Sequence, residues 1–353
     1  MNLEKFGWNP FFEAWFSEHA GDGAFPARVT SEHRGECRVL SEAGEMRAEV
    51  SGRLKHDAAG RLDLPAVGDW VLCHERSGGE ATIVAVFPRR SAFVRKAVGA
   101  RAVEQVVAAN VDTIFVVTGL DNDFSARRIE RYLTLTWESG ASPVVVLNKA
   151  DLADDLAARV AEVERVAAGA PVVAISAAEG SVESLVEWLR PGETVALLGS
   201  SGVGKSTITN RLLGGDAQRT AAVREHDSGG RHTTTHRELF LLPSGALLVD
   251  TPGMREVQLW GAGDEGLREA FDDVDQLARE CRFTDCRHEA EPGCAVAAAL
   301  AAGEIDGARV ASYHALQREL ASLEARRDQR LQLEQKRRWK TITKQMRHHP
   351  KKR

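Results

Sequence analysis

A glycine-rich segment at 199–206 has the residue spacing of a loop that binds nucleotide phosphates. Its sequence is Gly-Ser-Ser-Gly-Val-Gly-Lys-Ser, and it lies between an apolar run at 195–198 and a segment with helical patterning. Glycines let backbone N–H groups turn towards phosphate oxygens, and a helix N-terminus adds its dipole. In such a loop Lys205 reaches the β- and γ-phosphates, and Ser206 ligates Mg²⁺. The predicted phosphate-binding residues are Gly199, Ser200, Ser201, Gly202, Val203, Gly204, Lys205, Ser206 and Thr207.

A second motif, Asn-Lys-Ala-Asp at 148–151, indicates which base the nucleotide carries. The carboxylate of Asp151 can accept hydrogen bonds from N1–H and the 2-amino group of guanine, and adenine offers no such pair of donors. A site built on paired hydrogen bonds rejects an analogue that lacks them. Asn148 is expected to recognise the base edge, and Ser176 and Ala177 to complete the base pocket through backbone N–H groups. The predicted guanine site comprises Asn148, Lys149, Ala150, Asp151, Ser176 and Ala177.

A third motif, Asp-Thr-Pro-Gly at 250–253, follows the apolar run at 246–249. Asp250 is expected to hold Mg²⁺ through water, and the Gly253 amide to sense the γ-phosphate. One threonine of the preceding polar segment, 230–236, is expected to reach the same Mg²⁺ when GTP is bound. We assign this role to Thr234, with its neighbours Thr233 and Thr235 left open, and the alternative is that the segment is simply a polar loop.

The residue that would position the attacking water is less directly indicated. Many GTPases have a glutamine immediately after the glycine of the third motif, but here that residue is Met254, which cannot orient water. We therefore assign this catalytic role to His232. The alternative is that His232 is a surface histidine in a flexible loop.

A compact group of three cysteines and one histidine predicts a metal site. Cys281, Cys286, His288 and Cys294 offer three thiolates and one imidazole, which matches a tetrahedral structural Zn²⁺ with no open position for water. A thiolate-rich set disfavours Mg²⁺ and Ca²⁺. The alternative is buried cysteines beside an unrelated histidine. The chain has five cysteines, and this local clustering favours a reducing compartment over a disulfide framework.

The elements that must position these residues divide the chain into five parts. We predict an aromatic segment at 1–24, a small antiparallel barrel at 25–98, an α/β region at 100–262, a helical zinc-binding region at 263–325 and a basic tail at 326–353. Short strands separated by turn signals indicate the barrel, whose pattern fits an OB-type or an SH3-like fold. Alternating strands and helices indicate a doubly wound parallel sheet.

The aromatic segment carries Phe6, Trp8, Phe11, Phe12, Trp15 and Phe16. We expect this segment to pack on the neighbouring barrel, and the alternative is that it docks a partner. Cys37 and Cys73 fall in the barrel and are expected to be core residues.

The order of the motifs is unusual, because the base-recognition motifs at 148–151 and 176–177 precede the phosphate loop at 199–206. In most GTPases the phosphate loop comes first. A circularly permuted chain can still place every motif at the carboxyl end of a parallel strand, so the geometry of the site is preserved. The third motif then lies at the end of the α/β region and runs directly into the cysteine-bearing part.

Composition and charge exclude several classes of protein. Of the 353 residues, 43% are hydrophobic and 27% charged, which is typical of a folded chain, and no apolar run approaches the length of about 20 residues that spans a membrane. The N-terminus lacks the pattern of a secretory signal, so a cytoplasmic location is expected. The net charge is −5, yet residues 326–353 carry +10, which leaves −15 for residues 1–325. This split excludes a uniformly basic nucleic-acid binder and favours local binding of a polyanion by the tail, with a solvated helix end as the alternative.

Together these features resemble the circularly permuted, ribosome small-subunit-dependent GTPases of the RsgA (YjeQ) family, over roughly residues 25–325. The resemblance rests on the permuted order, the motifs at 148–151, 199–206, 232–235 and 250–256, the zinc spacing, Val67-Gly68-Asp69 and the residues Phe124, Ser125, Arg131, Tyr132 and Leu133. It implies an N-terminal OB barrel, a central circularly permuted P-loop GTPase and a C-terminal helical zinc-binding domain. It also implies that a histidine of the first switch is catalytic, and His232 is the matching position.

The resemblance further implies a GTPase that acts in late maturation of the small ribosomal subunit, with its hydrolysis stimulated by the subunit. We therefore expect a cytoplasmic, monomeric protein that binds the small subunit and its rRNA when loaded with Mg²⁺ and GTP, and leaves after hydrolysis. The barrel and zinc domain would contact rRNA, with Lys336, Arg337, Arg338 and Lys340 adding phosphate contacts. Two alternatives remain: a GTPase that acts on another RNA such as tRNA, and a non-enzymatic RNA scaffold gated by nucleotide.

Overall fold

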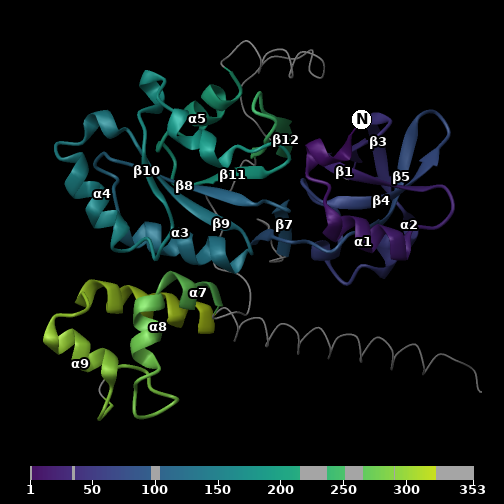
Figure 1. The fold of residues 1–353 in the computed structure, drawn as a ribbon. Helices are drawn as coiled ribbons and strands as arrows, with labels where there is room; N and C mark the ends of the chain where they lie inside the picture. Colours follow the sequence, from purple (N-terminus) through teal and green to yellow (C-terminus); the bar gives the residue numbers. More distant parts are fainter. Residues whose placement is uncertain are drawn as a thin grey trace, which may run out of the picture.

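The computed structural model describes residues 2–33, 36–96, 104–214, 237–250, 265–289 and 291–322. These residues form an N-terminal β-barrel, a central α/β region and a C-terminal group of helices (Figure 1). In the part of the chain that is described, every helix is too short or too polar to cross a membrane.

The N-terminal barrel has five strands in the order β1-β2-β3-β5-β4, and β4 pairs back with β1 to close it. The strands are β1 (Ala24–His33), β2 (Glu36–Ser41), β3 (Gly44–Val50), β4 (Trp70–Arg76) and β5 (Glu80–Val86). β3 and β5 run parallel, and the short helix α2 (Gly52–Asp57) lies between β3 and β4 in the chain. This closed five-stranded arrangement confirms the OB-type barrel.

Two predictions about the residues in and around the barrel are also confirmed. Cys37 and Cys73 are buried in its core, and burial raises the pKa of both thiols to about 12. The N-terminal segment, η1 (Leu3–Phe6) and α1 (Pro10–His19), packs its aromatic rings on the barrel. The Trp8 and Trp70 ring centroids are 4.8 Å apart, and those of Trp15 and Phe87 are 4.2 Å apart.

The central sheet has the strand order β10-β9-β8-β11-β13-β12. Its strands are β8 (Thr113–Gly119), β9 (Ser142–Asn148), β10 (Val172–Ala174), β11 (Thr194–Leu198), β12 (Arg237–Leu241) and β13 (Leu247–Asp250). The first five in this spatial order are parallel, as predicted. β12 runs antiparallel to β13, because the few residues of the turn around Gly245 can join only antiparallel neighbours.

Helices cover both faces of the central sheet, and two separate apolar clusters lie beneath them. The principal ones are α3 (Ala126–Glu138), α4 (Leu156–Glu164) and α5 (Lys205–Leu212). The 3₁₀ segment η3 (Ala150–Leu152) follows β9, and η4 (Ala177–Glu179) and then η5 (Glu183–Trp188) follow β10. The strands β6 (Ala92–Lys96) and β7 (Glu104–Ala109) pair as an antiparallel ribbon. In the chain, β6 precedes the predicted domain boundary near residue 99 and β7 follows it.

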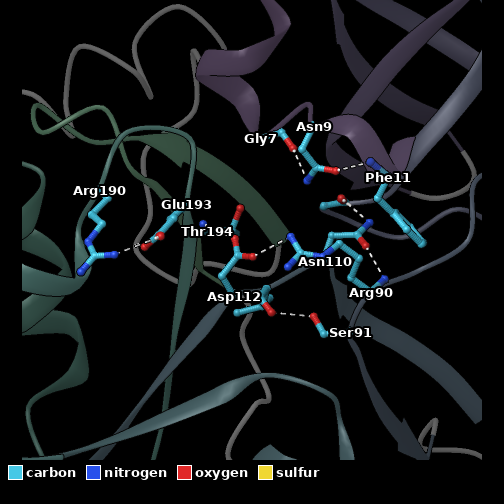
Figure 2. A network of polar contacts seen from close by, with 12 residues as sticks. Gly7, Asn9, Phe11, Arg90, Ser91, Asn110, Asp112, Arg190, Glu193 and Thr194 are labelled. Atoms are coloured by element: carbon cyan, nitrogen blue, oxygen red, sulfur yellow. Dashed lines mark hydrogen bonds and ion pairs between the residues drawn. The ribbon is translucent and has the colours of Figure 1, made fainter. Parts of the chain in front are cut away.

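The barrel and the central region are joined through backbone and side chains. β1 pairs with β12 at Ser31↔Glu238 and Glu32↔Arg237, so the two sheets are continuous. Three residues before Ser31 in β1, the buried guanidinium of Arg28 donates to the carbonyls of Phe6, Gly68 and Asn110 and to the Thr194 hydroxyl. Burial lowers the pKa of Arg28 to about 10. Figure 2 shows further contacts here, among them the Thr194 N–H donating to the Asp112 carboxylate at 2.9 Å.

The C-terminal helices are α7 (Glu265–Ala270), α8 (Asp272–Ala278), α9 (Ala295–Ala302) and a longer helix at 307–322. Of these, α7 lies next to α3 (Figure 1). Buried Arg309 connects the two parts, because its guanidinium is 2.9 Å from a Glu130 carboxylate oxygen on α3 and 2.6 Å from one of Asp273 on α8. Its guanidinium also lies over the Phe271 ring.

Candidate nucleotide site and metal centre

The predicted nucleotide residues that the structure describes meet at one edge of the central sheet. Gly199 follows β11, Asn148 ends β9, Ser176 follows β10, and Asp250 ends β13. These four strands are parallel, so their carboxyl ends lie on the same side. The sequence placed these residues at strand ends, and the structure brings them together despite the permuted chain order.

At two glycines of the phosphate loop, neighbouring atoms leave no room for a side chain. Gly199 has φ +157°, and a Cβ there would lie 2.2 Å from the Val117 carbonyl oxygen. Gly204 has φ +100°, and a Cβ there would lie 2.2 Å from Nδ2 of Asn148. Any larger residue would therefore distort the loop. Helix α5 begins directly after Gly204, and its first turn exposes Ser206 and Thr207.

Lys205 folds back onto the phosphate loop. Its Nζ donates to the carbonyl oxygens of Gly199, at 2.7 Å, and Ser200. These contacts hold the ammonium at the loop where phosphate oxygens would be bound. Contact of Lys205 with the β- and γ-phosphates stays a prediction.

Asn148 connects two of the predicted loops. Its side chain is buried, its Nδ2 donates to the Val203 carbonyl at 2.8 Å, and its Oδ1 accepts from the Ala177 N–H at 3.1 Å. Arg211 of α5 adds a bond from Nε to the Ala177 carbonyl. In this structure, therefore, the Asn148 side-chain oxygen and the Ala177 N–H are bonded to each other, and the Asn148 amide nitrogen is bonded to the phosphate loop. Contact of either residue with the base stays a prediction.

Asp151 is bonded to the loop that follows β10. Its backbone N–H donates to the Ser176 hydroxyl at 3.1 Å, and the residue is exposed. Lys149 beside it has a left-handed backbone, with φ +62°, and its Nζ lies 2.5 Å from a carboxylate oxygen of Asp121. This ammonium lowers the pKa of Asp121 below its ordinary value. Sequence reasoning missed Asp121, although its place just after β8 is the same strand-end signal that located the other motifs.

Three predicted residues, His232, Thr234 and Gly253, lie outside the described residues. Asp250 is described and half-buried, in register with Glu238 of β12. Asp250 ends β13, which is adjacent to β11, and β11 leads into the phosphate loop. The placement of Asp250 thus agrees with the predicted Mg²⁺ role, which stays a prediction.

The four predicted metal ligands converge. The ligand atoms of Cys281, Cys286, His288 and Cys294 all lie within 4.8 Å of one another. Nδ1 of His288 is 3.5 Å from the sulfurs of both Cys281 and Cys294, and these two sulfurs are 3.9 Å apart. A tetrahedral zinc ion with ordinary bond lengths requires about 3.8 Å between sulfurs and about 3.5 Å between sulfur and nitrogen. The donor set and its spacing therefore fit Zn²⁺.

Backbone N–H groups donate to the sulfurs of two of the ligands, Cys281 and Cys294. Cys294 is the N-cap of α9, and its sulfur accepts from the Ala297 N–H. Burial acts to raise the pKa of Cys281, but the N–H groups of Ala295 and Val296 and the neighbouring thiols outweigh it and lower this pKa below its ordinary value. Burial and the adjacent thiols raise the pKa of Cys286 to about 11.

Comparisons with known proteins agree on one family. A sequence profile described as "RsgA GTPase" matches residues 86–260. The chain is 53% identical to "Small ribosomal subunit biogenesis GTPase RsgA" of Opitutus terrae, over 97% of this chain and 96% of that protein. It is 44% identical to the protein of the same name from Syntrophotalea carbinolica, over 98% and 97%.

Solved structures show the same architecture. The crystal structure of YjeQ from Thermotoga maritima matches with a TM-score of 0.64 and 27% identity, over 85% of this chain and 98% of that one. The structure of YloQ, described as a circularly permuted GTPase, matches with a TM-score of 0.63 at 21% identity, over 87% and 98%. The second likeness concerns the fold alone.

Proposed function

Because the chain belongs to the RsgA family of GTPases, we propose that it hydrolyses GTP and acts in the biogenesis of the small ribosomal subunit. The observation that carries this proposal is the 53% and 44% identity to two proteins of that name over nearly the whole chain. It is supported by the phosphate loop and the Asn-Lys-Ala-Asp loop, which lie at the same edge of the sheet. In its finer form, the GTP-loaded protein binds the subunit, the subunit accelerates hydrolysis, and hydrolysis releases the protein.

The described residues divide the work of holding the nucleotide. Backbone N–H groups at 199–206 and the Lys205 ammonium would bind the phosphates, and Asp151 would accept from the base. Ser206 and Asp250 would hold Mg²⁺. When bound, this ion neutralises charge that develops on the phosphate oxygens. The bonds of Asn148 to Val203 and Ala177 fix the phosphate loop and the base loop relative to each other. They would therefore set the distance between the sites for the phosphates and for the base.

We also propose that the cysteine and histidine cluster holds one structural Zn²⁺. A structural ion with four protein ligands has no open position for water, so its contribution is folding free energy and not catalysis. The barrel and the zinc-bearing helices would contact rRNA. On the barrel itself Arg38 pairs with Glu45 and Arg76 with Glu49, so these cations are partly neutralised there. The basic residues at 336–340, whose placement lies outside the described part, would add phosphate contacts.

The proposed function predicts slow intrinsic turnover that small ribosomal subunits accelerate. Phosphate release from GTP is measured with the protein alone, and with purified small subunits, large subunits or tRNA added. Acceleration by small subunits only is the expected result. Acceleration by tRNA alone would favour action on another RNA, and no phosphate release under any condition would favour a nucleotide-gated scaffold.

The role proposed for His232 predicts a selective loss of turnover. His232→Ala is expected to reduce GTP hydrolysis by about 100-fold or more, because it removes the group that positions the attacking water. Affinity for GTP should change little, because the residue makes no ground-state contact in this role. Single-turnover hydrolysis and GTP binding are measured side by side, with His236→Ala as the control from the same segment. An unchanged hydrolysis rate would remove His232 from the site.

A further inference from the structure

Arg128 connects the first turn of α3 to the phosphate loop. Its guanidinium donates to the Ser200 hydroxyl at 2.8 Å, although the two residues are 72 positions apart in the chain. The same guanidinium pairs with the Asp123 carboxylate at 2.5 and 3.2 Å. The Asp123 contact raises the pKa of Arg128 above its ordinary value, so the donor is charged at every physiological pH.

Ser200 is held from two sides by side chains with different roles. Lys205 donates to its backbone carbonyl, and Arg128 donates to its hydroxyl. In the proposed function Lys205 leaves the carbonyl when it turns to the phosphates. Arg128 can keep its bond at that moment, because the hydroxyl it contacts is not part of the phosphate cradle formed by backbone N–H groups. Ser200 then retains one of these two side-chain contacts while nucleotide is bound.

The rest of α3 is bonded to the C-terminal helices. Arg131 makes two bonds of 2.7 Å with the Glu319 carboxylate on the helix at 307–322, and Glu130 pairs with Arg309. Near the end of α3, Glu138 accepts from the Gly266 N–H at 3.0 Å. The backbones are so close that a Cβ on Gly266 would lie 2.6 Å from the Thr134 carbonyl oxygen. Figure 1 shows α3 between the central sheet and α7.

We propose that Arg128 is a positioning residue that holds the phosphate loop through its bond to Ser200. Because α3 carries Arg128 and also contacts the C-terminal helices, changes in those helices reach the phosphate loop through α3. The ion pair with Asp123 contributes little by itself, because the two side chains are about one third and one half exposed and solvent screens them. The effect therefore comes from the charge-assisted bond to Ser200 and from the rigidity of one continuous helix. This inference rests on the proposed function, since it concerns the same nucleotide site.

The test compares two arginines of the same helix turn. Arg128→Ala is expected to weaken GDP binding by about ten-fold, the effect of losing one bond to a charged donor. Arg127→Ala removes the same charge from an exposed neighbour and is expected to leave GDP binding unchanged. Ser200→Ala should weaken binding as much as Arg128→Ala, and the double variant no further. Arg128→Lys, which keeps a charged donor, should recover part of the loss.

A second readout follows the C-terminal helices at saturating GDP. In the unaltered protein and in Arg127→Ala, GDP is expected to slow amide hydrogen exchange at 307–322, and in Arg128→Ala it should not. Three outcomes would overturn the inference and leave the proposed function intact. They are equal GDP affinity of the two arginine variants, additive losses of affinity in the double variant, and the same exchange protection in all of the proteins. Failure of the unaltered protein to bind GDP would overturn both.

Discussion

Asp151→Asn is expected to weaken GTP binding by about 10⁴-fold and to create binding of xanthosine triphosphate. The carboxylate of Asp151 is the acceptor assigned to guanine N1–H and the 2-amino group, and a site built for paired hydrogen bonds loses about this factor when the pairing fails. Xanthine carries an oxygen where guanine carries the amino group. The asparagine amide can donate to that oxygen, so the preference should reverse. Isothermal titration with GTP, xanthosine triphosphate and ATP measures all three affinities.

The control for this experiment is Asp154→Asn, which makes the same change at an exposed carboxylate three residues further on. It should bind GTP normally and xanthosine triphosphate weakly. A GTP affinity of Asp151→Asn within a few-fold of the original would show that this carboxylate is not the base acceptor. Equal binding of ATP and GTP by the unaltered protein would remove the guanine assignment altogether.

Cys294→Ala is expected to abolish binding of the zinc ion and to unfold the C-terminal helices. Structural zinc sites in small domains contribute roughly 10–16 kcal/mol of apparent binding free energy, which is available only to the folded state. Cys294 also caps α9 and is buried in the cluster shared with α3, so its loss removes a ligand, a cap and packing together. Metal content by mass spectrometry and hydrogen exchange of residues 265–322 measure the two effects.

Cys37→Ala provides the matched control, since Cys37 is a buried cysteine of the barrel, apart from the cluster. That variant should keep one zinc ion per chain and normal exchange in the C-terminal helices, with only the modest loss of stability that a small cavity causes. Full zinc content in Cys294→Ala would contradict the proposed ligand set.

The sequence was sufficient to predict the features that local patterns encode. The phosphate loop was predicted from glycine spacing between a strand and a helix, and the barrel from short strands with turn signals. Local patterns overestimated two helices. The helical patterning of 152–168 predicts one helix over that whole segment, but Asp155 caps α4 just before Leu156, and the left-handed Ala168 lies beyond its end at Glu164. The pattern at 182–189 likewise predicts an α-helix, but the segment forms the 3₁₀ helix η5, Glu183–Trp188.

Contacts between distant parts of the chain could not be predicted in this way. Arg28 is a charged residue in a strand of otherwise ordinary pattern, and only the meeting of the barrel with Thr194 of β11 shows why it is buried. Arg128 is indistinguishable from Arg127 in the sequence, and the fold alone brings it to Ser200. The motifs thus predict which residues would contact the nucleotide, whereas the side chains that hold those motifs in place emerged only from the three-dimensional arrangement.

The short pairing of β1 with β12 has a consequence for dissecting the protein. If the chain is cut near residue 98 to produce the barrel and the remainder separately, β12 becomes the outermost strand of the central sheet, and the end of β1 loses its neighbour. Both fragments then present unsatisfied N–H and C=O groups along a strand, which is the surface on which chains add to one another and aggregate. A chain that keeps the whole barrel together with the central region leaves these groups paired and should stay better dispersed than either fragment.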